Sequence, residues 1–388
     1  MKIHLAISVL LLAGCTSSDF VAIATGKNPS ATLERIANQK LKSYQVNPAA
    51  LRRDIELARA NYKKLLTLLR GDVATQWGTK EVVTPGNHRY VKYTDNYKSR
   101  AIVQFDEGLI VVETLDQLNP SESLRQAIIT TLLTPDDPRS VDLYSAKKVR
   151  LTGKPYLSGL VRDGANRLIN TPSRAEAYAR YLTERQSKNR NVDKDSGQET
   201  IHYVTFNMVS DHQNLRATRY EQPVSKYAEQ FSVSNSLIYA IMKTESSFNP
   251  FAVSSAPAYG LMQIVPTTAG RDSFKLVNGY EHTPSKEYLF NSDNNIELGI
   301  AYLHILDSRY LAKINNPVSR EYCTIAAYNG GAGSVLKLFS RDRKQATDII
   351  NSLSSNDVYL KLRDHHPRNE TRQYLVNVLA ARKDFVQL

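Results

Sequence analysis

The sequence of 388 residues lacks several features that would have placed it in a common class of protein. A membrane-spanning helix needs about 20 consecutive apolar residues, and the apolar run near the start covers only residues 5–13. No glycine-rich phosphate loop is present, and no His-Glu-x-x-His spacing occurs, although His365 and His366 are adjacent. The sequence therefore implies neither a cofactor nor a metal, and the short apolar run predicts a secretion signal rather than a lasting anchor.

Cysteine is almost absent, with only Cys15 and Cys323 in the chain. The run Leu-Ala-Gly-Cys at residues 12–15 resembles the lipobox of bacterial lipoproteins, which implies a signal peptide at 1–14 and a lipid on Cys15. Acyl chains would hold the mature protein at a membrane through buried methylene groups. By the sorting rule of Gram-negative lipoproteins, Thr16 implies an outer-membrane lipoprotein that faces the periplasm. The alternative is an ordinary secretion signal in which Cys15 occurs by chance. The other cysteine, Cys323, is expected to be a small core residue.

The charge is positive but unevenly placed. The net charge is +12, and residues 1–210 carry 30 Lys and Arg against 21 Asp and Glu. Nucleic acid is the usual partner of such a surface, but an exported lipoprotein does not meet it. Anionic cell-wall polymer or lipid headgroups are the polyanions left, and a basic surface that only aids solubility is the alternative.

The periodicity of apolar residues changes twice along the chain, and it predicts an α+β protein. After the signal we expect a tether and an amphipathic helical segment at 15–75, then an α+β accessory domain of mixed helices and strands at 76–210. Strands are expected at 89–94, 101–105, 109–114 and 203–209, and residues 187–200 are expected to form a charged linker. Residues 211–388 are expected to be all-α, with short helices joined by loops.

Glu245 is the most unusual acidic residue of this helical part. Four residues before it lies Ile241, and Leu237, Ile238 and Met242 recur at helical spacing, so Glu245 falls on the face that should point to a core. A structural carboxylate there needs a buried cation, and Lys243 lies on another face of the helix. Burial should raise the pKa of such a carboxyl, which suits a general acid that protonates a leaving oxygen.

A second acid is not supplied locally, because no Asp or Glu occurs between Ser246 and Arg271. Most glycosidases use two carboxylates, and the more distant candidates here are Asp293, Asp364 and Glu370. A lone acid indicates a substrate that carries its own nucleophile, since a tethered hydroxyl has a large proximity advantage.

Four motifs in order carry a family resemblance. They are ESSFNP at 245–250, GLMQI at 260–264, AYNGG at 327–331 and ETRQYL at 370–375. Together they resemble the motifs of the family 1 lytic transglycosylases, and with the N-terminal strands and the lipobox they resemble its membrane-bound type C. The resemblance implies a lysozyme-like catalytic domain that cleaves peptidoglycan between N-acetylmuramic acid and N-acetylglucosamine, leaving 1,6-anhydro ends.

The same resemblance assigns roles to individual side chains. It implies that Glu245 acts as the acid and then as the base. It implies that the substrate is bound by Ser254, Met262, Gln263, Tyr328, Asn329, Glu370 and Tyr374. Plainer interpretations stay open for several of these: Tyr328 and Tyr374 as core aromatics, Met262 as packing, and Glu370 as a favourable charge at a helix N-terminus.

Two other functions compete with the transglycosylase. A hydrolytic muramidase would use the same acid with water as the nucleophile. A non-catalytic wall-binding lipoprotein would have kept the fold without the reaction. In all three cases the expected partners are peptidoglycan strands and, through Cys15, a membrane.

Overall fold

The computed structural model describes residues 48–194 and 197–386, and within them the chain divides into two compact units. Unit 1 takes the chain up to Arg219 and two later segments, Ser246–Val265 and Ser285–Ser292. Unit 2 takes Tyr220–Glu245, Pro266–Pro284 and the chain from Asp293 onward. Unit 1 contains strands and helices, whereas the regular structure of unit 2 is helical, so the expected α+β class is confirmed.

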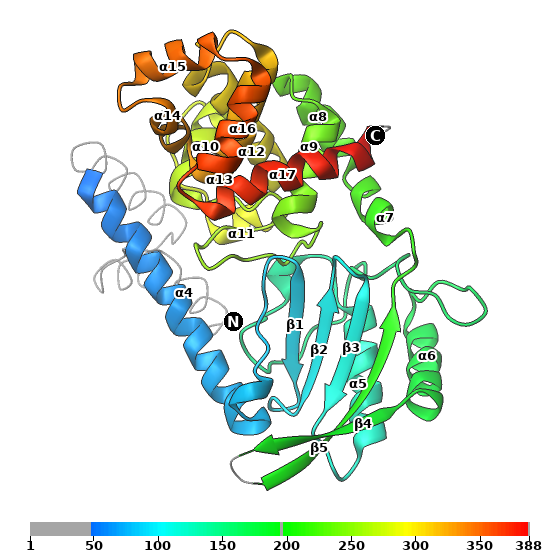
Figure 1. The fold of residues 1–388 in the computed structure, drawn as a ribbon. Coiled ribbons are helices and arrows are strands. Elements are labelled where there is room, and N and C mark those ends of the chain that lie inside the picture. The colour runs from blue at the N-terminus through cyan, green and yellow to red at the C-terminus, as the bar shows by residue number, and fades with distance from the viewer. Residues whose placement is uncertain (1–47, 195–196, 387–388) are drawn as a thin grey trace, which may run out of the picture. The chain divides into compact units, whose positions relative to one another are not determined.

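Unit 1 is built on an antiparallel sheet of five strands in the order β1-β2-β3-β5-β4 (Figure 1). The strands are β1 Arg89–Thr94, β2 Ser99–Gln104, β3 Leu109–Thr114, β4 Lys188–Lys194 and β5 Gly197–Asn207. Strands β1, β2 and β3 lie at or within two residues of the expected strands, whereas β5 begins six residues before the expected 203–209 and shares only residues 203–207 with it. The sheet therefore forms where the sequence pattern placed it, with one addition.

That addition is β4, which overturns the expected linker at 187–200. The segment instead forms an edge hairpin with β5, in which Asn189 pairs with His202 and Asn191 with Thr200. Val192 is the only apolar side chain of β4, so the strand gives almost no hydrophobic signal. Polar and charged residues are typical of sheet edges, because they discourage pairing with other chains.

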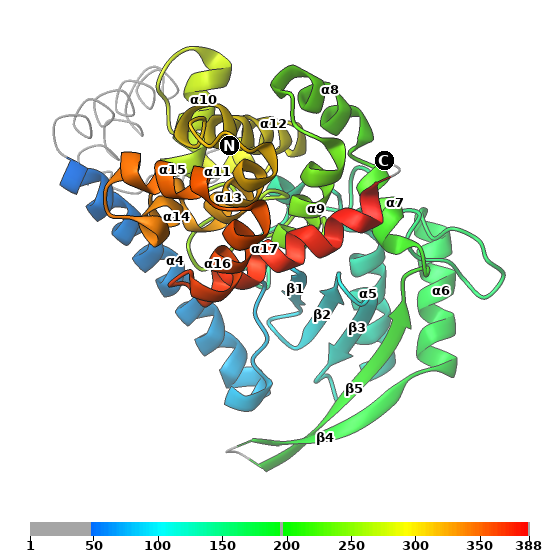
Figure 2. The same cartoon turned by 45° about the horizontal axis from the view of Figure 1, so that its top comes forward.

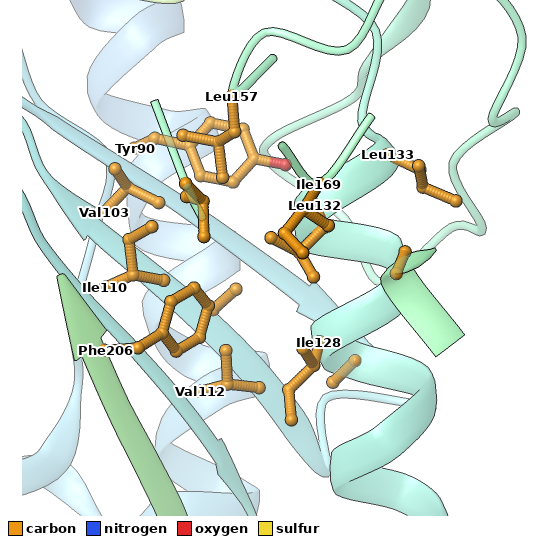
Figure 3. Packing of buried hydrophobic residues seen from close by; sticks show 14 of the residues in the cluster. Tyr90, Val103, Ile110, Val112, Ile128, Leu132, Leu133, Leu157, Ile169 and Phe206 are labelled. Atoms are coloured by element: carbon orange, nitrogen blue, oxygen red, sulfur yellow. The ribbon is translucent and has the colours of Figure 1, made fainter. Parts of the chain in front are cut away.

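Helices cover one face of this sheet. Helices α5 (Pro120–Leu133) and α6 (Pro172–Arg185) bury their apolar sides there. Figure 3 shows the core from close by, with side chains of the strands, such as Val103 and Phe206, meeting Ile128 of α5.

The opposite face is packed by the end of α4 (Pro48–Trp77). Leu69, Val73 and Trp77 of this helix are buried against Val91 and Tyr93 of β1. Alternate residues of β1 therefore enter two different cores, which is why four consecutive positions of this strand are buried.

A group of four charged side chains lies on the α4 side of the sheet, and we call it the sheet ion cluster: Glu81, Arg100, Glu113 and Arg190. Arg100 Nε lies 2.5 Å from Glu113 Oε2, and Arg190 bridges Glu81 at 2.7 Å and Glu113 at 3.1 Å. Arg100 is 2% exposed and Glu113 4% exposed. The Arg100 guanidinium also lies 3.9 Å from the centre of the Trp77 ring. Buried charges persist in proteins when they are paired in this way.

Unit 2 is a set of helices around α13 (Pro317–Gly330), which packs on α14, α16 and α17 (Figure 2). Besides α13, the C-terminal half contains α7 His212–Thr218, α8 Glu221–Phe231, α9 Asn235–Ser246, α10 Arg271–Asn278, α11 Lys286–Leu289, α12 Ser292–Ile305, α14 Ala332–Phe339, α15 Arg343–Ser352, α16 Ser355–His365 and α17 Asn369–Arg382. Cys323 on α13 is fully buried, which raises the pKa of its thiol to about 12 and agrees with the expected core role.

Candidate active site

Glu245 lies at the end of α9, one residue before the helix stops. The α9 residues 237–242 are all buried, and Glu245 itself is half-buried. The helix begins where the Ser234 hydroxyl accepts a hydrogen bond from the backbone N–H of Leu237 at 3.2 Å. The predicted position of Glu245 on the inward side of a helix is consistent with this burial.

The helix ends earlier than Pro250 would require. Ser247 and Phe248 both adopt positive φ angles, 49° and 56°, and these left-handed residues stop α9 directly after Ser246. A positive φ is uncommon for residues other than glycine and is a true outlier for a bulky one. Two such residues in succession indicate a strained turn immediately after Glu245.

Two tyrosine side chains interact with the Glu245 carboxylate within unit 2. Tyr328 lies on α13 and Tyr374 on α17, and both have pKa values well above the usual range. Burial is the larger cause and the negative charge of Glu245 is the next. Both hydroxyls therefore stay protonated at neutral pH, and they can donate hydrogen bonds to a carboxylate or to a substrate oxygen.

Tyr302 of α12 is a third tyrosine of this group, which the sequence did not single out. Its ring lies 5.6 Å from the ring of Tyr328, and burial also raises its pKa. Tyr302 and Tyr328 come from different helices, so their contact fixes the position of the Tyr328 ring.

The contact between α13 and α17 orients the polar groups beside these tyrosines. The Thr371 hydroxyl donates to Asn329 Oδ1 at 2.7 Å, and Asn329 Nδ2 donates to Glu370 Oε1 at 3.4 Å. A Cβ atom on Gly330 would lie 2.9 Å from Thr371 Oγ1, so only glycine permits this approach. Gly331 has a φ of 84° and ends the helix. The two glycines thus have different roles, one in packing and one in stopping α13.

The other acidic candidates have partners of their own. Asp293, at the start of α12, accepts a hydrogen bond from the Tyr227 hydroxyl at 2.8 Å. Asp364 is exposed at the end of α16 and forms an ion pair with Arg363 at 2.6 Å. Neither contact involves Glu245 or the tyrosines around it.

The remaining predicted residues lie in the 246–265 segment of unit 1. Met262 is fully buried, and Gln263 is 8% exposed with a φ of 48°. Gln263 Nε2 donates to the carbonyls of Ala252 and Gly260, and Ser254 Oγ accepts from the N–H of Ala258. These groups shape their own loop, and their substrate-binding roles stay predictions.

Neither a metal centre nor a membrane-spanning helix occurs in the described parts of the chain. Within residues 48–194 and 197–386, no three His, Cys, Asp or Glu side chains converge as a metal ion would require. No helix in those same residues combines the length and the apolarity needed to cross a membrane. Cys15 lies outside the described residues.

Comparisons with known proteins agree with the motifs. Residues 45–219 match the family described as membrane-bound lytic murein transglycosylase C, N-terminal domain, and residues 222–351 match the transglycosylase SLT domain. Membrane-bound lytic murein transglycosylase C of Yersinia enterocolitica is 48% identical over 310 residues, which cover 80% of this chain and 85% of the relative. The protein of the same name from Yersinia pestis is 47% identical over the same shares.

Two solved structures are also similar to this chain. One is the lytic transglycosylase Slt of Pseudomonas aeruginosa, determined as an inactive mutant, with 28% identity and a TM-score of 0.33. The other is the 70 kDa soluble lytic transglycosylase of Escherichia coli, with 26% identity and a TM-score of 0.34. Each comparison covers 43% of this chain and 24% of the other chain.

Proposed function

Because this chain belongs to the family of membrane-bound lytic murein transglycosylase C, we propose that Glu245 is the single catalytic acid of a peptidoglycan-cleaving reaction. The enzyme is a lytic transglycosylase that acts in cell-wall turnover. It cleaves the β-1,4 bond between N-acetylmuramic acid and N-acetylglucosamine. The observation that carries the assignment is a half-buried carboxyl among tyrosine hydroxyls that remain neutral.

The proposed reaction has two proton transfers and uses no water. The Glu245 carboxyl gives its proton to the glycosidic oxygen while the bond from that oxygen to C1 of the muramic acid breaks. The C6 hydroxyl of the same sugar then bonds to C1, and the Glu245 carboxylate takes the hydroxyl proton. A 1,6-anhydro ring forms and the carboxyl returns to its starting state, so one group serves as acid and base.

The tyrosines and the Asn329–Glu370 pair have supporting roles in this proposal. Tyr328 and Tyr374 donate hydrogen bonds to the Glu245 carboxylate or to the sugar, and their high pKa values prevent them from adding a competing negative charge. Glu370 orients the Asn329 amide toward the substrate. Ser254, Met262 and Gln263 are proposed to bind the glycan from the 246–265 loop.

Product analysis tests the reaction. Purified sacculi digested by the enzyme should release muropeptides with 1,6-anhydro ends, each one water lighter than the product of hydrolysis. Reducing ends in their place would identify a muramidase. Binding without any turnover would identify a wall-binding lipoprotein.

The location is proposed on separate grounds. The relatives are named membrane-bound. The lipobox at 12–15 supports a lipoprotein that is anchored in the outer membrane by a lipid on Cys15 and that faces the periplasm. The domain roles follow: residues 15–75 as tether and helical segment, 76–210 as accessory domain and 211–388 as catalytic domain. Replacing Cys15 by Ser should release the protein from membranes, whereas a variant that remained bound would overturn the lipid anchor.

A further inference from the structure

A cavity of about 370 Å³ lies on unit 1 between α6 and the turn at 163–167. Its lining combines two aromatic rings with three charged groups: Tyr178, Tyr181, Asp163, Arg167 and Arg174. The turn forms because Asp163 accepts hydrogen bonds from the backbone N–H groups of Ala165 and Arg167. The cavity is thus bounded by a helix and a hydrogen-bonded turn.

The two tyrosine rings stack on each other in the lining of the cavity. The rings are nearly parallel, with an angle of 16° and centroids 6.4 Å apart. Tyr178 is held edge-on against Phe206 of the core at 5.8 Å, whereas Tyr181 is 47% exposed. Exposed aromatic rings can pack against the C–H faces of sugar rings, and the half-exposed ring of Tyr181 offers such a face.

The arginines add recognition of anions. Arg167 is two-thirds exposed and contacts Asp163 through Nε at 2.8 Å. Arg174 donates through one terminal nitrogen to the Leu168 carbonyl at 3.0 Å. Each guanidinium has five N–H donors, so these contacts use only part of the capacity with which arginine binds carboxylates.

We propose that this cavity is a second, non-catalytic binding site for peptidoglycan. A sugar ring packs on the exposed ring of Tyr181, which Tyr178 supports, and a carboxylate of the lactyl group or the stem peptide binds Arg167 and Arg174. The inference rests on the proposed function for the identity of the polymer. The proposed site lies within residues 1–210, the part of the chain that carries the excess of positive charge.

Binding of sacculi by the full-length chain tests the site. In a Glu245→Gln background, Tyr181→Ala and Arg174→Gln should each weaken cosedimentation about three- to tenfold, the scale of one aromatic or charged contact. Arg185→Gln is the matched control, because Arg185 is exposed on the same helix but outside the cavity. A loss of the same size in Arg185→Gln, or full binding by Tyr181→Ala, would overturn the site.

Turnover separates this proposal from the proposed function. With Glu245 intact, Tyr181→Ala should cleave a short soluble glycan at the wild-type rate, because the cavity takes no part in the reaction. A wild-type chain without turnover would refute the lytic activity and leave the binding comparison valid. A lower rate for Tyr181→Ala on the short substrate would refute the non-catalytic assignment.

A different observation, the strained turn after Glu245, carries a second inference. Within unit 1, Arg216 of α7 (His212–Thr218) is 2% exposed and donates hydrogen bonds to the carbonyls of Ser247 and Phe105. The same guanidinium donates through Nε to the His212 carbonyl at 3.1 Å. One buried side chain therefore links the strained turn to the loop that follows β2.

Two further contacts hold the residues after this turn. Asn249 Nδ2 donates to the Asn87 carbonyl at 2.8 Å. Phe251 packs between Tyr90 and Tyr156, with ring centroids 5.1 and 5.2 Å away. Positive φ angles persist only where the surrounding structure enforces them. Here the groups that hold the turn belong to unit 1.

The geometry points to Arg216 as a positioning residue for catalysis. It binds the Ser247 carbonyl, two residues after Glu245 in the chain, and so restrains the peptide that follows the proposed acid. Lysine could not replace it, because a single ammonium cannot reach three carbonyls in the directions that a planar guanidinium does.

Matched arginine variants test this role. Arg216→Lys should lower kcat about tenfold with little change in KM, because the acid is misplaced while binding groups remain. Arg219→Lys is the control, since Arg219 holds the carbonyls of Tyr156 and Ser158 in another loop of unit 1. Asn249→Ala supplies a second variant with the same expected signature. Equal kcat values for the Arg216 and Arg219 variants, compared at equal folded fraction, would refute the positioning role.

Discussion

The sheet ion cluster and the Glu245 site provide their carboxylates with different kinds of partner. Glu113 is enclosed with two arginines, and Arg190 lowers the pKa of the neighbouring Glu81 carboxyl by hydrogen bonding. The groups that interact with Glu245 include the neutral hydroxyls of Tyr328 and Tyr374. An opposite charge fixes a carboxylate in one state, whereas a neutral donor permits protonation to change. The comparison sets a carboxylate that holds structure beside the carboxyl that we propose to move a proton.

The largest expected effect comes from removing the proton donor. Glu245→Gln should lower the rate of sacculus cleavage by about 10²–10⁴-fold, the usual worth of general acid catalysis. Glu229→Gln on the exposed side of α8 is the control and should be as active as the wild type. Release of anhydro-muropeptides, measured by mass spectrometry, gives both rates.

The lone-acid mechanism is tested on the other carboxylates. Asp293→Asn and Asp364→Asn should each keep most of the activity once folding is verified by circular dichroism. If either variant lost as much activity as Glu245→Gln, a second acid would be required and the proposed mechanism would be wrong.

The next effect should fall on stability and leave chemistry intact. Glu113→Gln leaves Arg100 buried with only Glu81 as its acidic partner, and should lower the free energy of unfolding by about 3 kcal/mol. Urea unfolding measures this loss. Glu122→Gln breaks the exposed pair with Arg125 and should cost less than about 1 kcal/mol; equal losses would contradict the distinction between buried and exposed pairs.

A buried cation that donates to backbone carbonyls gives a pH-dependent version of the comparison. Lys92 of β1 is 2% exposed and donates to the carbonyls of Asp142 and Ser145, and burial lowers its pKa from 10.5 to about 8. Between these values the unfolded chain binds more protons than the folded one, so the free energy of unfolding rises with pH. The full difference is on the order of 3 kcal/mol and is lost as the pH falls through about 8.

Variants at Lys92 isolate this contribution. The difference in unfolding free energy between wild type and Lys92→Met should grow in favour of the wild type from pH 8 to pH 10. Lys98→Met, at the exposed turn between β1 and β2, is the control and should show a difference that is flat with pH. A flat difference for Lys92→Met as well would show that this lysine is as easily protonated in the fold as in water.

The smallest expected effect sharpens the tyrosine side of the comparison. Tyr374→Phe removes a hydroxyl beside Glu245 and keeps the buried ring, so kcat should fall about tenfold and remain above that of Glu245→Gln. Tyr322→Phe, whose ring packs on Tyr359, is the control. An unchanged kcat in Tyr374→Phe would return Tyr374 to the role of a core aromatic.

The sequence predicted those parts of the fold and site that have a local signal. Apolar alternation identified β1, β2, β3 and β5, and helical spacing identified Glu245. The strand β4 has polar residues throughout except Val192, so no periodicity marked it.

Other features have no local signal because they depend on tertiary contacts. The chain has 22 tyrosines, and nothing in the sequence distinguishes Tyr302 from the rest. Arg216 follows no motif, and its burial depends on carbonyls more than 30 residues before and after it. The close packing of Gly330 on Thr371 likewise became evident only from the fold, although both residues lie in recognised motifs.

The discontinuous division of the chain means that no single cut could separate the two units into independent pieces. The backbone passes from one unit to the other after Arg219, Glu245, Val265, Pro284 and Ser292. The proton donor is the last residue before one of these crossings. Proteolytic nicking of the 246–265 segment should therefore inactivate the enzyme while every helix of unit 2 remains intact.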